Sequence, residues 1–452
     1  MKKLTTAAAL LLTTTGAHAA GIDRNLTNYG TLFEPGNYVE LSYAAVKPSV
    51  SGTYQAPFDT LGGSASTGVM SKDFSTLSGS LKYDLTPRLA LGLFFNQPFG
   101  ADADYPQGFY RGLSAEWDSN GQTIMMKYKV TPAISVYGGV RSIESEANIV
   151  IPSQLLGAST GQELGARAGQ AGAAAQEKAD LARAAGAAAA AAQADGDLAQ
   201  AQQLGAQAAA LAAQAQALQA QAIELGGQAQ AILDPNSALT GRFTYTAHAE
   251  KDRQTSYVIG AAYEKPEIAL RVAFTYESGY THKFSTTETF GGADLPPSTT
   301  SISMPDVYTL DFQSGVAQDT LVFGSIRHAT WSDWHVKPAG YANITGGEEV
   351  TGIDSDSTTY RLGVGRKFSD NVSGFVRVTY EPSNGDDLSR LAPTDGSTSF
   401  GVGGTYTRDA FKITGGVEYI KFGEGNDDPA RTNTRFADND AVAVGLSVGY
   451  RF

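Results

Sequence analysis

The chain closes on AVAVGLSVGYRF, residues 441–452, in which apolar side chains occupy every second position. Successive side chains of a strand point to opposite faces, so one face of this segment is wholly apolar and the other is small or polar. A strand of a soluble sandwich can alternate too. Unbroken alternation up to an aromatic last residue is instead typical of the wall of an outer-membrane barrel. The sequence therefore predicts an all-β fold, a transmembrane antiparallel β-barrel, and Phe452 resembles the terminal signal read by the barrel-assembly machinery.

The N-terminus carries the features of a secretory signal peptide. Lys2 and Lys3 precede an apolar, threonine-rich stretch, and Ala17-His18-Ala19 offers a small-x-small cleavage site. This layout predicts removal of residues 1–19 and export of the chain, with the outer membrane of a Gram-negative bacterium as its destination. A retained N-terminal anchor is the alternative, but the apolar core is too short to span a bilayer.

Composition restricts the class of protein further. No other apolar run reaches the roughly 18 residues that a transmembrane helix needs. Yet 42% of the residues are hydrophobic, and the chain holds 21 Tyr, 20 Phe and 51 Gly, as suits short alternating segments in a barrel wall. The lack of cysteine excludes disulfides and thiolate metal sites. A formal charge of −13 without a basic patch argues against nucleic acid as a partner.

Short polar turns divide the chain into strands. One pattern, an aromatic residue followed by a polar or Pro turn and renewed alternation, recurs in YDLTPRLAL, YKVTPAISV and YEKPEIAL. Proline and Asx residues form such turns through a fixed φ and side-chain capping. Six tight turns predict seven hairpins and about fourteen strands, with twelve or sixteen as alternatives. The expected spans are 37–50, 72–84, 89–99, 120–130, 133–150, 240–263, 267–285, 300–315, 319–336, 350–368, 372–385, 396–407, 410–425 and 438–452.

Residues 157–235 interrupt this pattern. Ala, Gln and Gly dominate from Gly161 to Leu233, which favours helix over strand. A heptad stripe predicts a coiled-coil seam, formed by Leu204, Leu211, Leu218, Leu225 and Ile232. Asp195-Gly196-Asp197 breaks the run near its middle. An antiparallel helical hairpin in the outer loop between strands five and six is therefore expected, with a fraying low-complexity loop as the alternative.

Several segments, taken in order, resemble one family. They are AAVKPSVSG (44–52), FNQPFG (95–100), MPDVYTLDFQSGVAQDTLVFGSIRHATWSDW (304–334), YRLGVGRKFSDNVSGFVRVTYEPS (360–383) and the terminal GYRF. This set is similar to the FadL/TodX outer-membrane transporters of fatty acids and hydrocarbons. The resemblance implies a monomeric fourteen-stranded barrel in outer-membrane lipid and lipopolysaccharide, and a hydrophobic small-molecule ligand. It also implies capture at outer loops, an apolar lumen pocket, lateral exit at an inward kink of the third strand, and no cofactor.

The chain departs from the family pattern at its N-terminal hatch. Only residues 20–36 precede the barrel, residues 37–452, and FEPG (33–36) replaces an Asn-Pro-Ala-like motif. The plug segment must be short, which puts hatch gating in question. The helical insertion occupies the place of a long outer loop, so an extended capture surface is a hypothesis based on position.

Alternation also predicts arginines that face the lumen. They lie between outward apolar positions, and they are Arg141, Arg271, Arg327, Arg361 and Arg377. A planar guanidinium in a partly apolar lumen suits a ligand carboxylate. Ordinary pairing with Asp and Glu across the barrel is the alternative for each of them.

Asn96, Pro98 and Gly100 mark the expected lateral opening. Proline cannot donate to a ladder and glycine often marks a bulge, so a break is expected at the end of the third strand. A simple strand end at the membrane rim is the alternative. Trp331 and Trp334 are assigned to an interfacial aromatic belt, with stacking against a ligand as the alternative.

No catalytic or metal site is predicted. The histidines of the mature chain, His248, His282, His328 and His335, lack metal-ligand spacing. No G-x-S-x-G elbow accompanies the serines near His328. The expected function is passive transport of hydrophobic small molecules, with long-chain fatty acids as the leading ligands. A diffusion porin for polar solutes and a surface scaffold or adhesin that displays the hairpin are the alternatives.

Overall fold

The computed structural model describes residues 22–234, 242–428 and 432–452, and the predicted signal peptide, residues 1–19, lies outside them. The helices are η1 (Tyr29–Phe33), η2 (Phe58–Gly63), α1 (Ser153–Leu156), α2 (Ala158–Ala194), α3 (Leu198–Leu233), η3 (Pro266–Ile268), η4 (Trp331–Asp333) and α4 (Ala339–Thr345). The longer strands are β1 (Tyr38–Ser49), β3 (Phe74–Asp84), β4 (Leu89–Asn96), β5 (Gly100–Asp104), β6 (Ser114–Lys129), β7 (Ile134–Ile151), β8 (Tyr245–Lys265), β9 (Leu270–Glu277), β10 (Tyr280–Phe290), β12 (Ser298–Met304), β13 (Val307–Ala317), β14 (Thr320–Ala329), β17 (Ser357–Lys367), β18 (Val372–Glu381), β19 (Ser397–Arg408), β20 (Phe411–Phe422) and β23 (Asp440–Arg451). The short strands are β2 (Gly52–Thr53), β11 (Ala293–Asp294), β15 (His335–Val336), β16 (Thr351–Gly352), β21 (Gly425–Asn426) and β22 (Arg435–Phe436).

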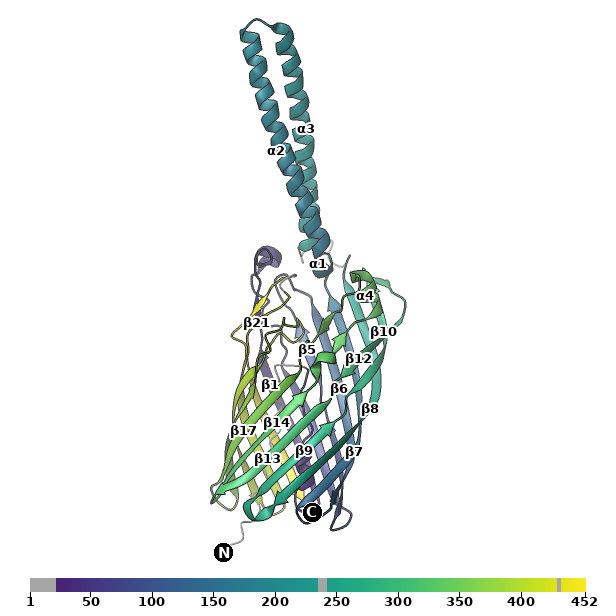
Figure 1. Ribbon diagram of the computed structural model, residues 1–452, viewed down its shortest axis with the longest axis vertical. Helices are drawn as coiled ribbons and strands as arrows, with labels where there is room; N and C mark the ends of the chain where they lie inside the picture. The colour runs from purple at the N-terminus through teal and green to yellow at the C-terminus, as the bar shows by residue number, and fades with distance from the viewer. Residues whose placement is uncertain (1–21, 235–241, 429–431) are drawn as a thin grey trace.

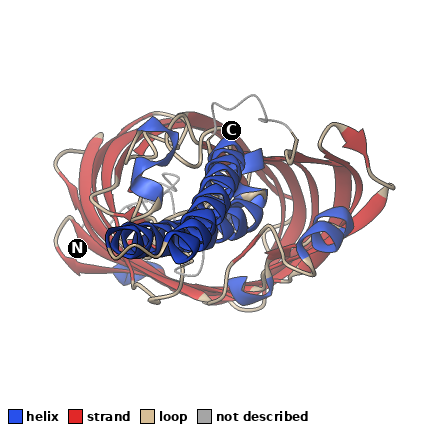
Figure 2. Ribbon diagram, turned by 90° about the horizontal axis from the view of Figure 1, so that it is seen from above, coloured by secondary structure: helices blue, strands red, loops and turns tan. Residues whose placement is uncertain are grey.

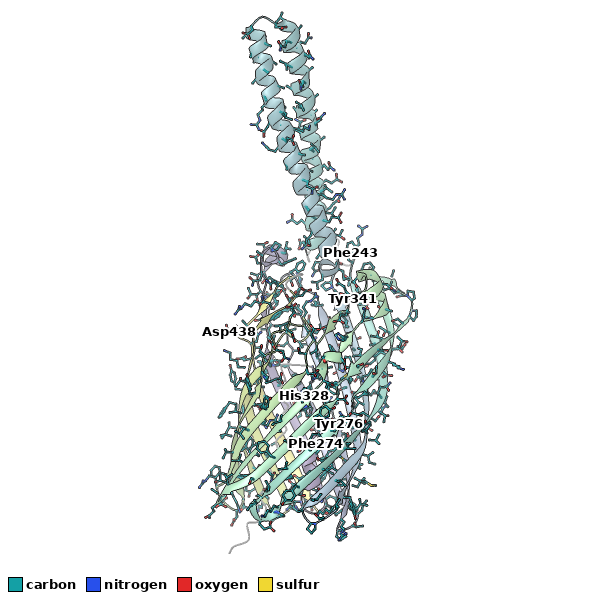
Figure 3. All side chains as sticks on the ribbon, in the orientation of Figure 1. Phe243, Phe274, Tyr276, His328, Tyr341 and Asp438 are labelled. Atoms are coloured by element: carbon teal, nitrogen blue, oxygen red, sulfur yellow. The ribbon has the colours of Figure 1, made fainter. Side chains whose placement is uncertain are left out.

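The long strands close into one antiparallel barrel of 14 strands, which confirms the predicted fold class and strand count. β1 pairs with β23 on one side and with β3 on the other, and so joins the two ends of the sheet. Three barrel strands are interrupted, because β4 continues as β5, β9 as β10 and β12 as β13. Seen from above, the strands form an oval ring (Figure 2).

The outward face of the wall is apolar, as a membrane requires. In β23, Val442, Val444 and Leu446 are exposed, whereas Ala441 and Ala443 between them are buried. Exposed aromatic side chains gather toward both strand ends. Those on the loop side include Tyr360, Tyr380 and Tyr419, and those on the turn side include Tyr83, Tyr128, Tyr263, Tyr406, Phe411 and Tyr450. Aromatic girdles of this kind flank the apolar band of outer-membrane barrels.

The helical insertion forms the predicted hairpin. α2 and α3 stand side by side beyond the loop end of the barrel (Figure 1). Gly196 turns the chain with a φ of 85°, and the Asp197 carboxylate caps α3 by accepting from the Gln200 N–H at 3.0 Å. The heptad leucines are half-buried in the seam, and Ala215 and Ala229 are fully buried between them. No helix in the described part of the chain is long and apolar enough to cross a membrane.

The N-terminal segment, residues 22–36, runs through the lumen instead of joining the wall. Leu32 is fully buried among lumen-facing side chains that include Phe94, Met125 and Tyr137. Near the turn end, the Glu34 carboxylate pairs with Lys412 at 2.7 Å. Near the loop end, Ile22 joins the outer hydrophobic cluster. A nearly extended chain gains roughly 3.3 Å per residue, so this short segment can contact the wall along most of the lumen.

Candidate ligand site in the barrel lumen

An apolar cavity of about 40 Å³ lies in the outer half of the lumen. Inward alanines of β6, β7 and β8 leave the space, and larger apolar side chains close it, among them Ile22, Trp117, Ile302, Trp334 and Leu391. Loop segments after β14 and β18 supply part of this lining, so the cavity is covered on the side of the outer loops. This lining suits a hydrocarbon group. Apolar ligand surface would be buried there, and no polar atom of the wall would lose a hydrogen-bond partner.

All three tryptophans of the chain lie in this region. Trp331 and Trp334 are 0% and 4% exposed, so their assignment to an interfacial belt is wrong. β14 ends at Ala329, and the following turn η4 folds inward and carries both indoles into the lumen. The Trp334 ring lies 6.1 Å from that of Trp117 and 6.5 Å from that of Trp331. The three indoles therefore form one wall of the outer lumen.

A second, polar cavity of about 80 Å³ lies between the N-terminal segment and the strands β9, β13, β14 and β17. The register aligns Asp311 of β13 with Ser325 of β14, and Ser325 with Arg361 of β17, so the three side chains share one row. Arg327 lines the same cavity two residues farther along β14. Charged and hydroxyl groups thus face a small buried space, which can hold the polar group of a ligand.

The structure places the five predicted arginines inside the barrel, but in different situations. Arg141 pairs with Glu277, and Arg377 pairs with Glu418. The Arg271 guanidinium lies 4.6 Å from the centre of the Phe33 ring. Arg327 forms a bidentate ion pair with Asp23, in which Nη1 lies 2.8 Å from Oδ2 and Nη2 lies 3.2 Å from Oδ1.

Arg361 differs from the other four. It makes no hydrogen bond, ion pair or ring contact with any described residue, and its Nε is buried. Asp311 lies within electrostatic reach but does not bond to it. Arg361 and Arg271 are therefore the two predicted arginines whose donors no described residue accepts, and of these two only Arg361 lines the polar cavity.

The third barrel strand is broken where the sequence suggested. β4 ends at Asn96 and β5 begins at Gly100, and β3 pairs with β4 only from Gly79 onward. The N-terminal segment bonds to the break instead. Arg24 N–H donates to the Pro98 carbonyl at 2.8 Å, and Gly100 N–H donates to the Ile22 carbonyl at 2.8 Å. The Asn96 amide donates to the Asn25 carbonyl at 2.5 Å.

The Arg24 side chain fills the space beside this break. Its guanidinium stacks 4.4 Å from the centre of the Phe74 ring on β3 and pairs with Asp102 on β5 at 2.8 Å. A Cβ atom at Gly100 would collide with this side chain, so glycine is needed for the close approach. Nearby, the outer surface carries an apolar hollow of about 680 Å³ over β1, β3, β4 and β6, lined by side chains such as Leu41, Leu93 and Phe95.

Solved structures with the same architecture include a FadL homologue and two toluene transporters. A Pseudomonas aeruginosa FadL homologue matches with a TM-score of 0.59 at 12% identity, over 94% of this chain and 92% of that chain. The chain has the FadL/TodX barrel fold. The Pseudomonas putida toluene transporter TodX matches at 0.55 and 12% identity over 97% of both chains, and the Ralstonia pickettii toluene transporter TbuX at 0.53 and 11% identity, also over 97% of both chains. No protein-family model and no curated protein matches the sequence.

The histidines do not assemble a reactive centre in the described part of the chain. No group of three or more His, Cys, Asp or Glu side chains that could hold a metal ion occurs there. His282 bonds to Asp252 at 2.7 Å inside the wall, and His335 lies beside Glu349 at 3.0 Å in an outer loop.

Sequence reasoning did not find Asp23 and Arg24. The only hint in the sequence is that both residues are charged in a plug segment with few charges. Their partners, Arg327 and Asp102, lie far along the chain.

Proposed function

We propose that the protein is a monomeric outer-membrane channel that passes long-chain fatty acids by diffusion. The observation that carries the proposal is the adjacency of two cavities on the N-terminal segment. Ile22 lines the apolar cavity, and Leu26 to Gly30 line the polar one. A ligand with a hydrocarbon chain and an anionic end matches this arrangement, with the carboxylate at Arg361. The neighbouring barrels of the same fold are described as transporters of toluene and as a FadL homologue, which agrees with a hydrophobic cargo.

Exit through the wall is part of the proposal. The break at residues 96–100 directly follows Phe95, which lines the apolar hollow on the outer surface. A ligand released through the break into this hollow would enter the bilayer without crossing water. The route is closed by Arg24 and by the backbone bonds between residues 22–25 and the break. Passage therefore requires the N-terminal segment to move.

The packed lumen weighs against the porin alternative. A water-filled channel needs an open polar bore, whereas Leu32, Phe33 and Glu34 contact side chains of the wall. α2 and α3 pack side by side in a hairpin. We assign this hairpin to the capture surface because its base, including Leu156 and Leu233, packs against the outer hydrophobic cluster.

Binding of oleate to the protein in lipid nanodiscs tests the proposal. Saturable binding is expected, and Arg361→Gln should weaken it by about 10- to 150-fold, because one charged hydrogen bond contributes roughly 1.5–3 kcal/mol. Arg253→Gln is the matched control, since Arg253 pairs with Glu144 on the exposed outer face. Absence of oleate binding combined with a large ion conductance would replace the transporter by a porin.

A further inference from the structure

The N-terminal segment presents an apolar side chain and a carboxylate at adjacent positions in the lumen. Ile22 is 4% exposed and helps to line the apolar cavity. Asp23 is 5% exposed and forms the two-pronged pair with Arg327. Adjacent side chains of an extended segment point in opposite directions, so the apolar group reaches into one cavity while the carboxylate reaches toward the other. Together, Ile22 and Asp23 present an apolar group and a carboxylate, which are the two parts of a fatty acid.

Arg327 also belongs to the polar cavity that contains Arg361. A carboxylate in this cavity therefore faces one arginine without a described partner and a second one held by Asp23. Removing the partner of a buried arginine leaves an uncompensated charge and is strongly unfavourable, whereas exchanging one carboxylate for another keeps the arginine paired. The structure is thus arranged for carboxylate exchange at Arg327.

We propose that Ile22 and Asp23 act as an internal substitute for an amphiphilic carboxylate ligand, which binds by displacing Asp23 from Arg327. This inference rests on the proposed function, and it adds that Asp23 of the protein itself competes with the ligand carboxylate for Arg327. Residues 22–24 also hold the wall break through the Gly100 and Pro98 bonds.

The competition fixes the direction of a mutational effect. If the exchange-competent state holds about 1–10% of the population, the internal competitor weakens the apparent affinity about 10- to 100-fold. Asp23→Asn keeps the size of the side chain but removes its charge, so it should tighten oleate binding by about tenfold or more. Oleyl alcohol has the same chain without a carboxylate, and its binding should change less than about twofold.

The test compares oleate and oleyl alcohol binding by the full-length protein in nanodiscs for wild type, Asp23→Asn and Arg327→Gln. Tighter oleate binding in Asp23→Asn, with unchanged oleyl alcohol binding, supports the inference. Arg327→Gln should reduce the preference for oleate over the alcohol to the part that Arg361 supplies, and Asp23→Asn added to Arg327→Gln should not raise it again. Equal oleate affinity in wild type and Asp23→Asn overturns the inference and leaves the transporter intact, whereas binding of neither compound by any variant overturns the proposed function itself. Glu144→Gln is the matched control, because Glu144 pairs with Arg253 and belongs neither to the polar cavity nor to the wall break.

Discussion

Leu32→Ala should open the lumen without unfolding the barrel. Leu32 is 0% exposed, and its contacts with Phe94, Met125 and Tyr137 anchor the N-terminal segment inside the wall. Truncating a buried leucine to alanine costs about 2–5 kcal/mol. The substitution should weaken docking of the N-terminal segment and not the barrel itself, because the backbone hydrogen bonds between the wall strands are unchanged. The ratio of docked to undocked segment should therefore fall by about thirty-fold to a few thousand-fold.

Single-channel recording in planar bilayers measures this ratio as an open probability. The wild-type protein should remain closed almost throughout, and Leu32→Ala should show open events more frequent by the factor above. Leu321→Ala is the matched control, because Leu321 is buried in a wall cluster with Phe323 and Phe375 that includes no residue of the N-terminal segment. An equal open probability in the wild type and Leu32→Ala would refute the reasoning, as would an equal rise in both variants.

Two further predictions concern the loop end of the barrel. Burial alone would raise the pKa of the Glu288 carboxyl, but its hydrogen bonds to Tyr245, Ser298 and the backbone of Gly340 and Tyr341 hold that pKa below its usual value of 4.5. A carboxyl group with a lowered pKa stabilises the fold at pH values above 4.5, and this contribution is lost as the pH falls below 4.5. The protection of α4 amides, measured relative to their intrinsic exchange rates, should therefore fall below about pH 4.5, and in Glu288→Gln it should already be low at pH 7. Replacing residues 165–229 by a short glycine linker should leave oleate binding by the purified barrel unchanged, because the base of the hairpin is retained, but should slow oleate uptake by cells; unchanged uptake would remove the hairpin from the capture surface.

The wall was predictable from sequence because its signal is local. A period of two, set by the geometry of the strand, distinguishes outward Val442 and Val444 from inward Ala441 and Ala443 without knowledge of any other segment. The same alternation predicted that the side chain of Arg361 faces the lumen. The heptad stripe of α3 predicted the hairpin for a similar reason, since the spacing of its leucines depends on the helix alone.

The occupants of the lumen were not predictable in this way. Asp23 and Arg327 are separated by 304 positions, and the sequence gives no pattern that links them. Trp331 and Trp334 were misplaced because their direction depends on how an irregular loop folds after β14, where alternation no longer applies. The break at Asn96 to Gly100 was expected from residue type, but its pairing with residues 22–25 depends on the path of the plug.

Quenching of intrinsic fluorescence by brominated fatty acid tests the central claim most directly, because all three tryptophans of the chain line the outer lumen. Bromine quenches an indole only at close contact, so the signal reports occupancy of this site. Brominated stearate should quench the nanodisc-embedded protein saturably, whereas a brominated phospholipid, confined to the bilayer, should not. If brominated stearate quenches no more than the phospholipid does, the lumen is not the site of the hydrophobic ligand.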